Sequence, residues 1–249
     1  MSGGEAHELA ERFWILAGER EPFPRSLEQP VLWSLPVAVF KLPRLGLDTV
    51  RAWLHARGVE VALPHVPQRM MRGFVLAQAG NGIIFVDAND PLEEQRFSFA
   101  HEVAHFLVDY LWLRQKALAV LGEAVQEVLD GLRPPTPAER LTSVLRAVPL
   151  GLYTHLLDRP TTGQVASNQV ADAEDRADGL ALELLAPQGE VVRMLYAMAP
   201  QHHGPAAEDA CSEILRTTFG LPAMAAASYA RSILWRRAGN RSTREWLGL

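Results

Sequence analysis

Residues His101-Glu102-Val103-Ala104-His105 form an HExxH run inside an apolar stretch. On an α-helix, a step of four residues is slightly more than one turn, so the two histidines project side by side and can reach one metal ion. The glutamate beside them is then placed to deprotonate a metal-bound water, whose pKa zinc lowers to about 7. The run therefore predicts a zinc hydrolase in which His101 and His105 bind the metal and Glu102 is the general base.

The flanking residues predict that this run lies on a buried helix. Asp90-Pro91-Leu92-Glu93 has the order of an N-cap, a proline at the first helical position and a capping-box glutamate. Apolar residues then follow at helical spacing, at Phe97, Ala100, Ala104, Leu107, Val108 and Leu111. The alternative is a pair of core histidines satisfied by hydrogen bonds. Since only about two in a hundred chains of this composition would contain HExxH by chance, we favour the metal interpretation.

A catalytic zinc usually has three protein ligands and one open position, so a third ligand is expected elsewhere in the chain. Glu174 leads a helical face whose other members are small or apolar, and an unpaired carboxylate on such a face would be costly. The helix dipole alone would also favour an acid there, but with HExxH present we favour Glu174 as the ligand. The competing candidates are Asp172, Asp175, Glu183, His155, His202 and His203.

The run extends into a longer pattern, Arg96-Phe97-Ser98-Phe99-Ala100-His101-Glu102-Val103-Ala104-His105-Phe106-Leu107. A second pattern follows as Glu174-x-x-Ala177-Asp178-x-Leu180-Ala181-x-x-Leu184-Leu185-x-Pro187. Together they resemble the ImmA/IrrE family of zinc metallopeptidases, with its patterns close to RFTLAHELGH and ExxANxFAxxLLMP. The resemblance implies His101, His105 and Glu174 as zinc ligands and Glu102 as general base. It also implies a narrow substrate, a partner transcriptional repressor.

The chain departs from the family pattern at several positions, none of which is a metal ligand. Asp178 stands where the family usually has Asn, Leu180 where it has Phe, Ala186 where it has Met, and Asp87 where a strand usually ends in Asn. The segment of residues 112–170 is also much longer than the family's usual link between the two metal-binding helices.

Composition and charge exclude several classes of protein. With 249 residues, 48% hydrophobic and 21% charged, the chain is globular and not disordered. A net charge of -5 argues against nonspecific nucleic-acid binding. Cys211 is the single cysteine, which excludes an internal disulfide, is compatible with a reducing cytoplasm and predicts a small buried residue. The start lacks a basic region and no apolar run approaches about eighteen residues, so we expect no signal peptide, no membrane span and a cytoplasmic location.

Strands are expected before the metal helix. Residues 70–77 and 82–86 predict a hairpin around Ala79-Gly80-Asn81-Gly82, because Asn-Gly is a strong turn signal. By analogy with other HExxH peptidases, residues 82–86 are expected to form an edge strand that pairs with an extended substrate; the alternative is a simple core strand. Further upstream we expect a helix at residues 5–18, a proline-rich extension with a short strand near 37–40, and a helix capped by Asp48 and ended by Gly58.

The link between the metal-binding helices is predicted to be a helical hairpin over the site. Residues 115–132 form its first helix, Pro134-Pro135 breaks it, and Thr136-Pro137-Ala138-Glu139 begins a helix reaching about residue 157. The hairpin could be a lid, a substrate wall or a packing accessory.

The C-terminal part predicts a helix at residues 207–218, a turn and a helix at 223–236. The second helix begins Ala223-Met224-Ala225-Ala226-Ala227 and lacks polar base-reading side chains, so we interpret the pair as packing. Candidates for stabilising an oxyanion are His202, His203, Tyr153, His155, Tyr196 and Tyr229.

The sequence thus predicts an α+β, zincin-like fold, with a small antiparallel or mixed sheet beside the HExxH helix and a second ligand-bearing helix. The predicted parts are an N-terminal extension (1–43) and a metallopeptidase domain (44–249) with a helical insertion (112–170) and a C-terminal helical pair (207–237). The predicted function is a Zn²⁺-dependent endopeptidase that cleaves an intracellular protein, by resemblance a helix-turn-helix repressor, without binding nucleic acid or membrane. The alternatives are a metal-dependent sensor or binding module that cuts no peptide, or a stoichiometric partner of the toxin–antitoxin type. His₂Glu sites also accept Mn, Fe or Co.

Overall fold

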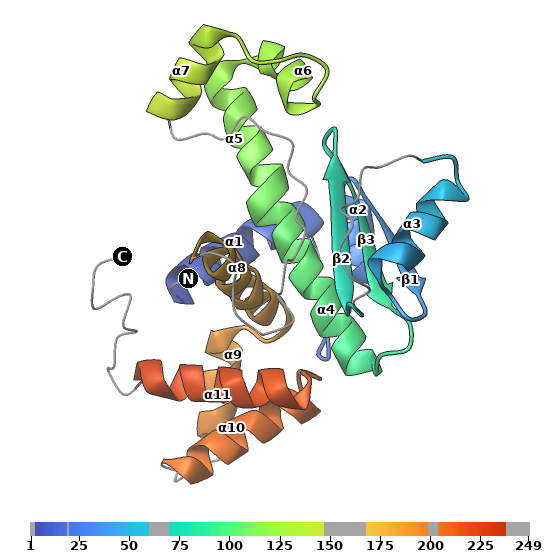
Figure 1. Ribbon diagram of the computed structural model, residues 1–249. Coiled ribbons are helices and arrows are strands. Elements are labelled where there is room, and N and C mark those ends of the chain that lie inside the picture. Colours follow the sequence, from blue (N-terminus) through green and yellow to red (C-terminus); the bar gives the residue numbers. More distant parts are fainter. Residues whose placement is uncertain (1–2, 19, 60–69, 147–167, 199–203, 238–249) are drawn as a thin grey trace.

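The computed structural model describes residues 3–18, 20–59, 70–146, 168–198 and 204–237 (Figure 1). A small sheet lies between helix α3 and a long helical rod, and the predicted α+β class is confirmed. None of the helices in these ranges combines the length and apolarity needed to cross a bilayer. The elements are α1 (Gly3–Ala17), α2 (Glu28–Ser34), β1 (Val37–Leu42), α3 (Leu47–His55), β2 (Gly73–Gln78), β3 (Asn81–Asp87), α4 (Leu92–His105), η1 (Phe106–Leu111), α5 (Trp112–Leu121), η2 (Glu123–Val125), α6 (Gln126–Leu129), α7 (Pro137–Leu145), α8 (Asn168–Leu185), α9 (Gln188–Met198), α10 (Pro205–Thr217) and α11 (Ala223–Arg237).

The sheet has the strand order β1-β3-β2, with β1 parallel and β2 antiparallel to β3. The central strand is apolar on both faces: Phe85 packs with the buried side of α3, while Ile84 and Val86 pack in the main core with α4. The prediction that residues 82–86 form an edge strand is therefore wrong. A continuous apolar run indicates that both faces of a strand are covered, but it does not tell whether another strand pairs along each of its edges, so sequence alone did not separate the two.

The β2–β3 hairpin exists, but its turn lies earlier than predicted. Ala79 and Gly80 occupy the turn, both with positive φ (48° and 82°), whereas Asn81 and Gly82 already belong to β3. Gly82 is needed for packing: a Cβ at this position would lie 2.7 Å from Cε2 of Phe106. The glycine thus lets η1 approach the sheet closely.

Two predicted helix caps are wrong, and one is confirmed. Pro91 and Gly46 are the N-cap residues of α4 and α3, and neither helix start has a side-chain cap. Asp48 instead bonds Arg51 within the first turn of α3, at 2.7 Å. At α7, by contrast, Thr136 and Glu139 form the predicted capping box. Because α4 starts at Leu92, one residue later than predicted, Glu93 is the second residue of the helix and is out of register for a capping box.

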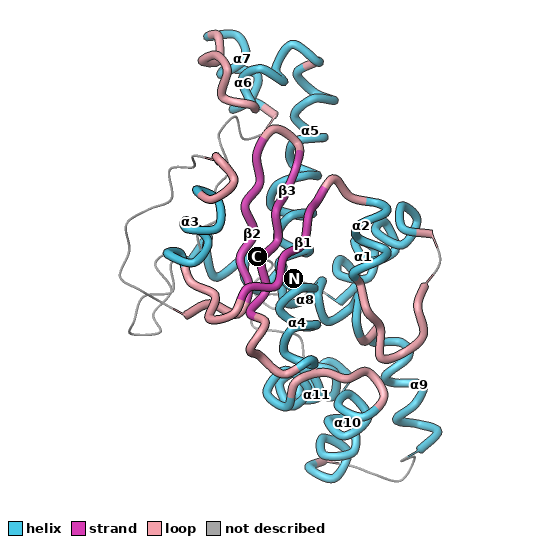
Figure 2. Tube along the Cα trace, turned by 90° about the vertical axis from the view of Figure 1, so that its right-hand side faces the viewer, coloured by secondary structure: helices cyan, strands magenta, loops and turns pink. Residues whose placement is uncertain are grey.

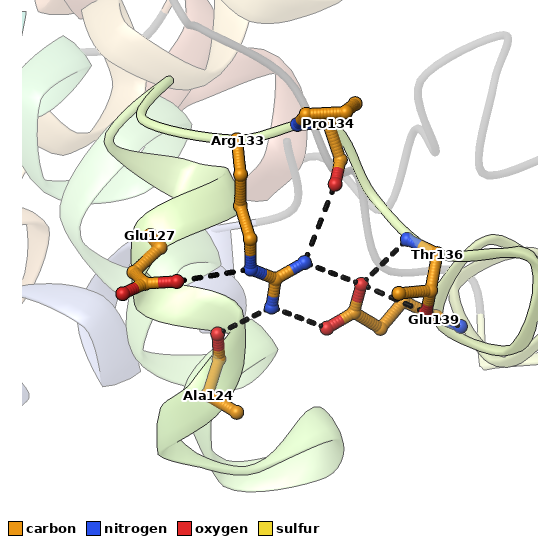
Figure 3. A network of polar contacts seen from close by, with 6 residues as sticks. All are labelled: Ala124, Glu127, Arg133, Pro134, Thr136 and Glu139. Carbon is orange, nitrogen blue, oxygen red and sulfur yellow. Dashed lines mark hydrogen bonds and ion pairs between the residues drawn. The ribbon is translucent and has the colours of Figure 1, made fainter.

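The rod of α4, η1 and α5 leads into the insertion, whose described helices α6 and α7 lie at its outer end (Figures 1 and 2). Arg133 ties these helices together, bonding Glu127, Glu139 and the carbonyls of Ala124 and Pro134 (Figure 3). The hydrogen bond from Arg133 is the main cause that lowers the pKa of Glu139 to about 2. The second predicted helix ends at Leu145 and not near residue 157, because Arg146 already leaves the helical conformation (φ -100°, ψ 2°). Cover of the site by the insertion stays a prediction.

The core is built around contacts of α4 with α8 and of α8 with α1. From the N-terminal segment, Phe13 and Trp14 of α1 are buried in this core, and β1 pairs with β3 from Gly82 to Asp87. The division of the chain at residues 43 and 44 stays a prediction.

The C-terminal helices α10 and α11 lie at the end of the rod opposite to α6 and α7 (Figures 1 and 2). Their connecting turn is fixed by the buried side chains of Phe219 and Leu221. A hydrogen bond from Nη2 of Arg96 on α4 to the carbonyl of Gly220, 2.9 Å long, also holds the turn. Cys211 on α10 is fully buried, as expected.

Candidate metal centre and active-site cleft

His101 and His105 lie one turn apart on the buried face of α4, with 7% and 2% of their surface exposed. Their Nε2 atoms are 3.0 Å apart. Each Nδ1 faces a carboxylate, which can only accept a hydrogen bond, so each Nδ1 carries the proton and the lone pair of a neutral ring lies on Nε2. Two nitrogen lone pairs directed to the same buried position can bind one metal ion.

Glu174 on α8 completes the cluster. Its carboxylate oxygens lie 3.6 Å from Nε2 of His101 and 3.7 Å from Nε2 of His105. Ligand atoms around a tetrahedral metal at ordinary bond lengths lie about 3.3 Å apart. The 3.0 Å between the two Nε2 atoms is slightly shorter than this separation, and the two distances from Glu174 are slightly longer. The three side chains therefore fit a single small metal ion.

Small residues bring the two ligand-bearing helices together. Ala100 and Ala104 on α4, and Ala177 and Ala181 on α8, are all at most 1% exposed and belong to one core cluster. Side chains of this size let two helix backbones approach closely. The close packing brings the first turns of α8 within reach of the histidines.

His105 is oriented by a buried carboxylate that is itself held by an arginine. Its Nδ1 donates to Oδ2 of Asp109 (2.7 Å), and Nη2 of Arg176 donates to Oδ1 of the same group (3.1 Å). Asp109 lies in η1, a stretch of π-helix that follows His105 directly. Carboxylates behind a ligating histidine fix its ring and raise its basicity, so this chain of contacts is what a metal site needs around it.

His101 has the corresponding partner on the other ligand-bearing helix. Its Nδ1 donates to Oδ1 of Asp178 at 2.8 Å. Burial by itself lowers the pKa of His101, but the hydrogen bond to Asp178 and the charges of Glu102, Asp178 and Glu174 together raise that pKa above its ordinary value. The surroundings therefore attract positive charge to this ring, whether a proton or a metal ion.

Glu102 is 3% exposed and lines a cleft of about 490 Å³ together with His101 and Asp178. Its carboxylate lies against Gly73, the first residue of β2. A Cβ on Gly73 would be 2.7 Å from both Cγ and Oε1 of Glu102. The absence of a side chain at Gly73 thus leaves the space that the carboxylate occupies.

Residues 55–115 match the family model Peptidase_M78, described as the IrrE N-terminal-like domain. The resemblance to the ImmA/IrrE family is confirmed over this segment. No curated protein and no solved structure matches the chain. The matched family is one of peptidases, and its segment contains His101, Glu102, His105 and Asp109 but ends before α8. The α+β architecture is that expected of a zincin-like M78 fold.

Other candidates from the sequence lie away from His101 and His105 or outside the described residues. Glu183 bonds His7 and the backbone N–H of Gln188 instead (both 3.0 Å). Tyr229 donates to the same Glu183, and burial is the main cause that raises its pKa. Asp172, Asp175 and Tyr196 are not part of the described cluster, and Tyr196 is mostly exposed. Tyr153, His155, His202 and His203 lie outside the described residues.

Sequence reasoning gave no role to three residues of the site, and it gave Asp178 none beyond a departure from the family pattern. Asp109 carried a usable signal, because it lies four residues after His105 and such a pair shares one helix face. Arg176 and Gly73 gave no comparable signal, since their importance depends on contacts between separate elements.

Proposed function

We propose that this chain is a zinc-dependent endopeptidase. The observation that carries the proposal is the convergence of His101, His105 and Glu174 on one point, with Glu102 in the adjoining cleft. Two imidazoles and one carboxylate are the ligand set of several catalytic zinc sites, and the M78 match points to a peptidase. The single cysteine is compatible with a reducing compartment, and the cytoplasm remains the predicted location.

The side chains divide the chemistry between them. When bound, zinc supplies an activated water and polarises the scissile carbonyl. Glu102 takes the proton of the attacking water and passes it to the leaving amine. Asp109 and Asp178 hold the two imidazoles so that Nε2 of each points to the metal position.

An extended substrate is proposed to add to β2 along the edge at which none of the described strands pairs. Among the described strands, β2 is the one at the sheet edge beside α4, and Arg72, Gly73 and Phe74 line the cleft that contains Glu102. Pairing with a sheet edge holds a peptide through its backbone and leaves its side chains to pockets. This places β2 in the role that the sequence had given to β3.

The metal site is tested by measuring bound metal per chain by elemental mass spectrometry. We expect about one zinc in the wild type, a large loss in Glu174→Ala, and no loss in Asp175→Ala, an exposed acid on the same helix. If the wild type binds no zinc after reconstitution, the proposal fails and a metal-free binding protein takes its place.

Peptidase activity is tested on a proteome-derived peptide library with zinc-loaded protein. Glu102→Gln should keep its zinc and lose about 10²- to 10⁴-fold in turnover, whereas Glu93→Gln, an exposed acid of α4, should cleave normally. Undiminished cleavage by Glu102→Gln contradicts its role as base. Zinc binding without any cleavage favours the sensor or binding module.

The proposed natural substrate is a transcriptional repressor, a class supported only by the family resemblance. New protein N-termini should appear in cells that express the wild type and be missing in cells that express Glu102→Gln. If these termini map to proteins other than DNA-binding repressors, the substrate class is wrong while the peptidase stands.

A further inference from the structure

We infer that the cleft beside the metal centre contains an apolar subsite, walled by the C-terminal helix α11, that selects a long, uncharged side chain next to the scissile bond. The inference rests on the proposed peptidase function, since it assigns the specificity of that same site. Sequence reasoning had interpreted the C-terminal helical pair as packing, and the inference gives this pair a part in substrate recognition.

Four elements line the subsite with apolar side chains. Met70 and Met71 lie just before β2, Phe97 on α4 and Leu182 on α8, and the outer wall is Pro222 and Met224 at the start of α11. Two of these methionines are far more exposed than a packing role requires, Met70 at 64% and Met224 at 83%. The flexible methionine side chain is suited to a surface that adapts to another apolar side chain.

The wall formed by α11 is held in place before any substrate binds. The turn that precedes it is anchored by the buried side chains of Phe219 and Leu221, and by the hydrogen bond from Arg96 to the carbonyl of Gly220. Gly220 has a φ of +64° and its Cα faces Arg96 so closely that a Cβ would displace the arginine. A subsite that is formed in advance adds to affinity because little order is lost on binding.

The charges and the apolar walls of the cleft together favour a neutral occupant. Among the described lining residues, Arg72 and Glu94 are paired with each other, so they add little net charge. At the metal end, Glu102 and Asp178 are acids. An acidic substrate side chain would meet these carboxylates, and a basic one would lose hydration among the apolar walls. Leucine, methionine and phenylalanine are the natural residues that fit.

Hydroxamates test the subsite without requiring cleavage. Two series of hydroxamates are compared, and they differ in the side of the chelating group that carries the substituent. Within each series the substituent is hydrogen, isobutyl, benzyl or carboxymethyl. Their binding to zinc-loaded protein is measured by calorimetry. In one series, the isobutyl and benzyl compounds should bind about tenfold more tightly than the hydrogen compound, and the carboxymethyl compound more weakly.

Substitution of the wall then links the preference to α11. Met224→Asp should remove most of the isobutyl preference while the zinc content and the affinity of the hydrogen compound stay unchanged. Met198→Asp, a methionine of similar exposure (69%) on α9 that does not line the cleft, should keep the preference. Equal affinities within both series, or a preference that survives Met224→Asp, would overturn the inference. Since binding is read without turnover, failure of peptide cleavage would instead count against the proposed peptidase.

Discussion

Replacing Gly73 by alanine tests whether the approach of β2 to the HExxH helix positions the catalytic carboxylate. The new Cβ would lie 2.7 Å from Cγ and Oε1 of Glu102, whereas ordinary contacts begin at 3.4 Å. Either the carboxylate or the strand must therefore shift by about 0.7 Å, and a misplacement of about 1 Å can cost about 100-fold in rate. We expect kcat to fall by about 10- to 100-fold while one zinc per chain is retained.

The assay is steady-state cleavage of a peptide found in the library screen, together with zinc content and the free energy of unfolding. Gly82→Ala is the matched control, because its Cβ would also approach a neighbour to 2.7 Å, but the neighbour is the core ring of Phe106. That variant should lose about 1–3 kcal/mol of stability through overpacking and retain kcat in the folded fraction. Full kcat with normal zinc content in Gly73→Ala would refute the reasoning that this glycine makes room for the base.

Three further outcomes follow from the contacts around the site. Asp109→Asn should weaken zinc binding by about 10- to 100-fold in a chelator competition, because the ligating imidazole loses its charged partner; unchanged affinity would contradict that role. Since the pKa of His101 is raised in the metal-free protein, zinc binding should displace a proton from this ring more often than from an ordinary histidine, and the displaced fraction should grow as the pH falls through that pKa. Asp178→Asn lowers that pKa, so calorimetry in buffers of different ionisation enthalpy should show fewer protons released than in the wild type, and an equal number would count against the prediction. Gly220→Ala should lower the free energy of unfolding by about 1–3 kcal/mol in urea denaturation, because its φ of +64° and the nearness of Arg96 exclude a side chain; unchanged stability would show that the turn can relax.

Local sequence determined the parts of this protein that depend on neighbours along the chain. The four-residue step between His101 and His105 places both on one face of any helix that contains them, so the pair could be predicted without a fold. The capping box at Thr136 and Glu139 formed as predicted for the same reason. The hairpin was also predicted, although the choice between Ala79-Gly80 and Asn81-Gly82 as its turn was not, because register depends on pairing along the whole of β3.

Tertiary structure alone decided the features that join distant segments. Which strand lies at the edge is a matter of strand order, and β1 takes its place beside β3 through pairing that no local pattern encodes. Glu174 was one candidate among several until the close packing of α4 on α8 brought its carboxylate to the histidines. The contacts of Gly73 with Glu102 and of Arg176 with Asp109 arise in the same way. Helical spacing fixes which side chains share a face, but only packing between elements fixes what that face meets.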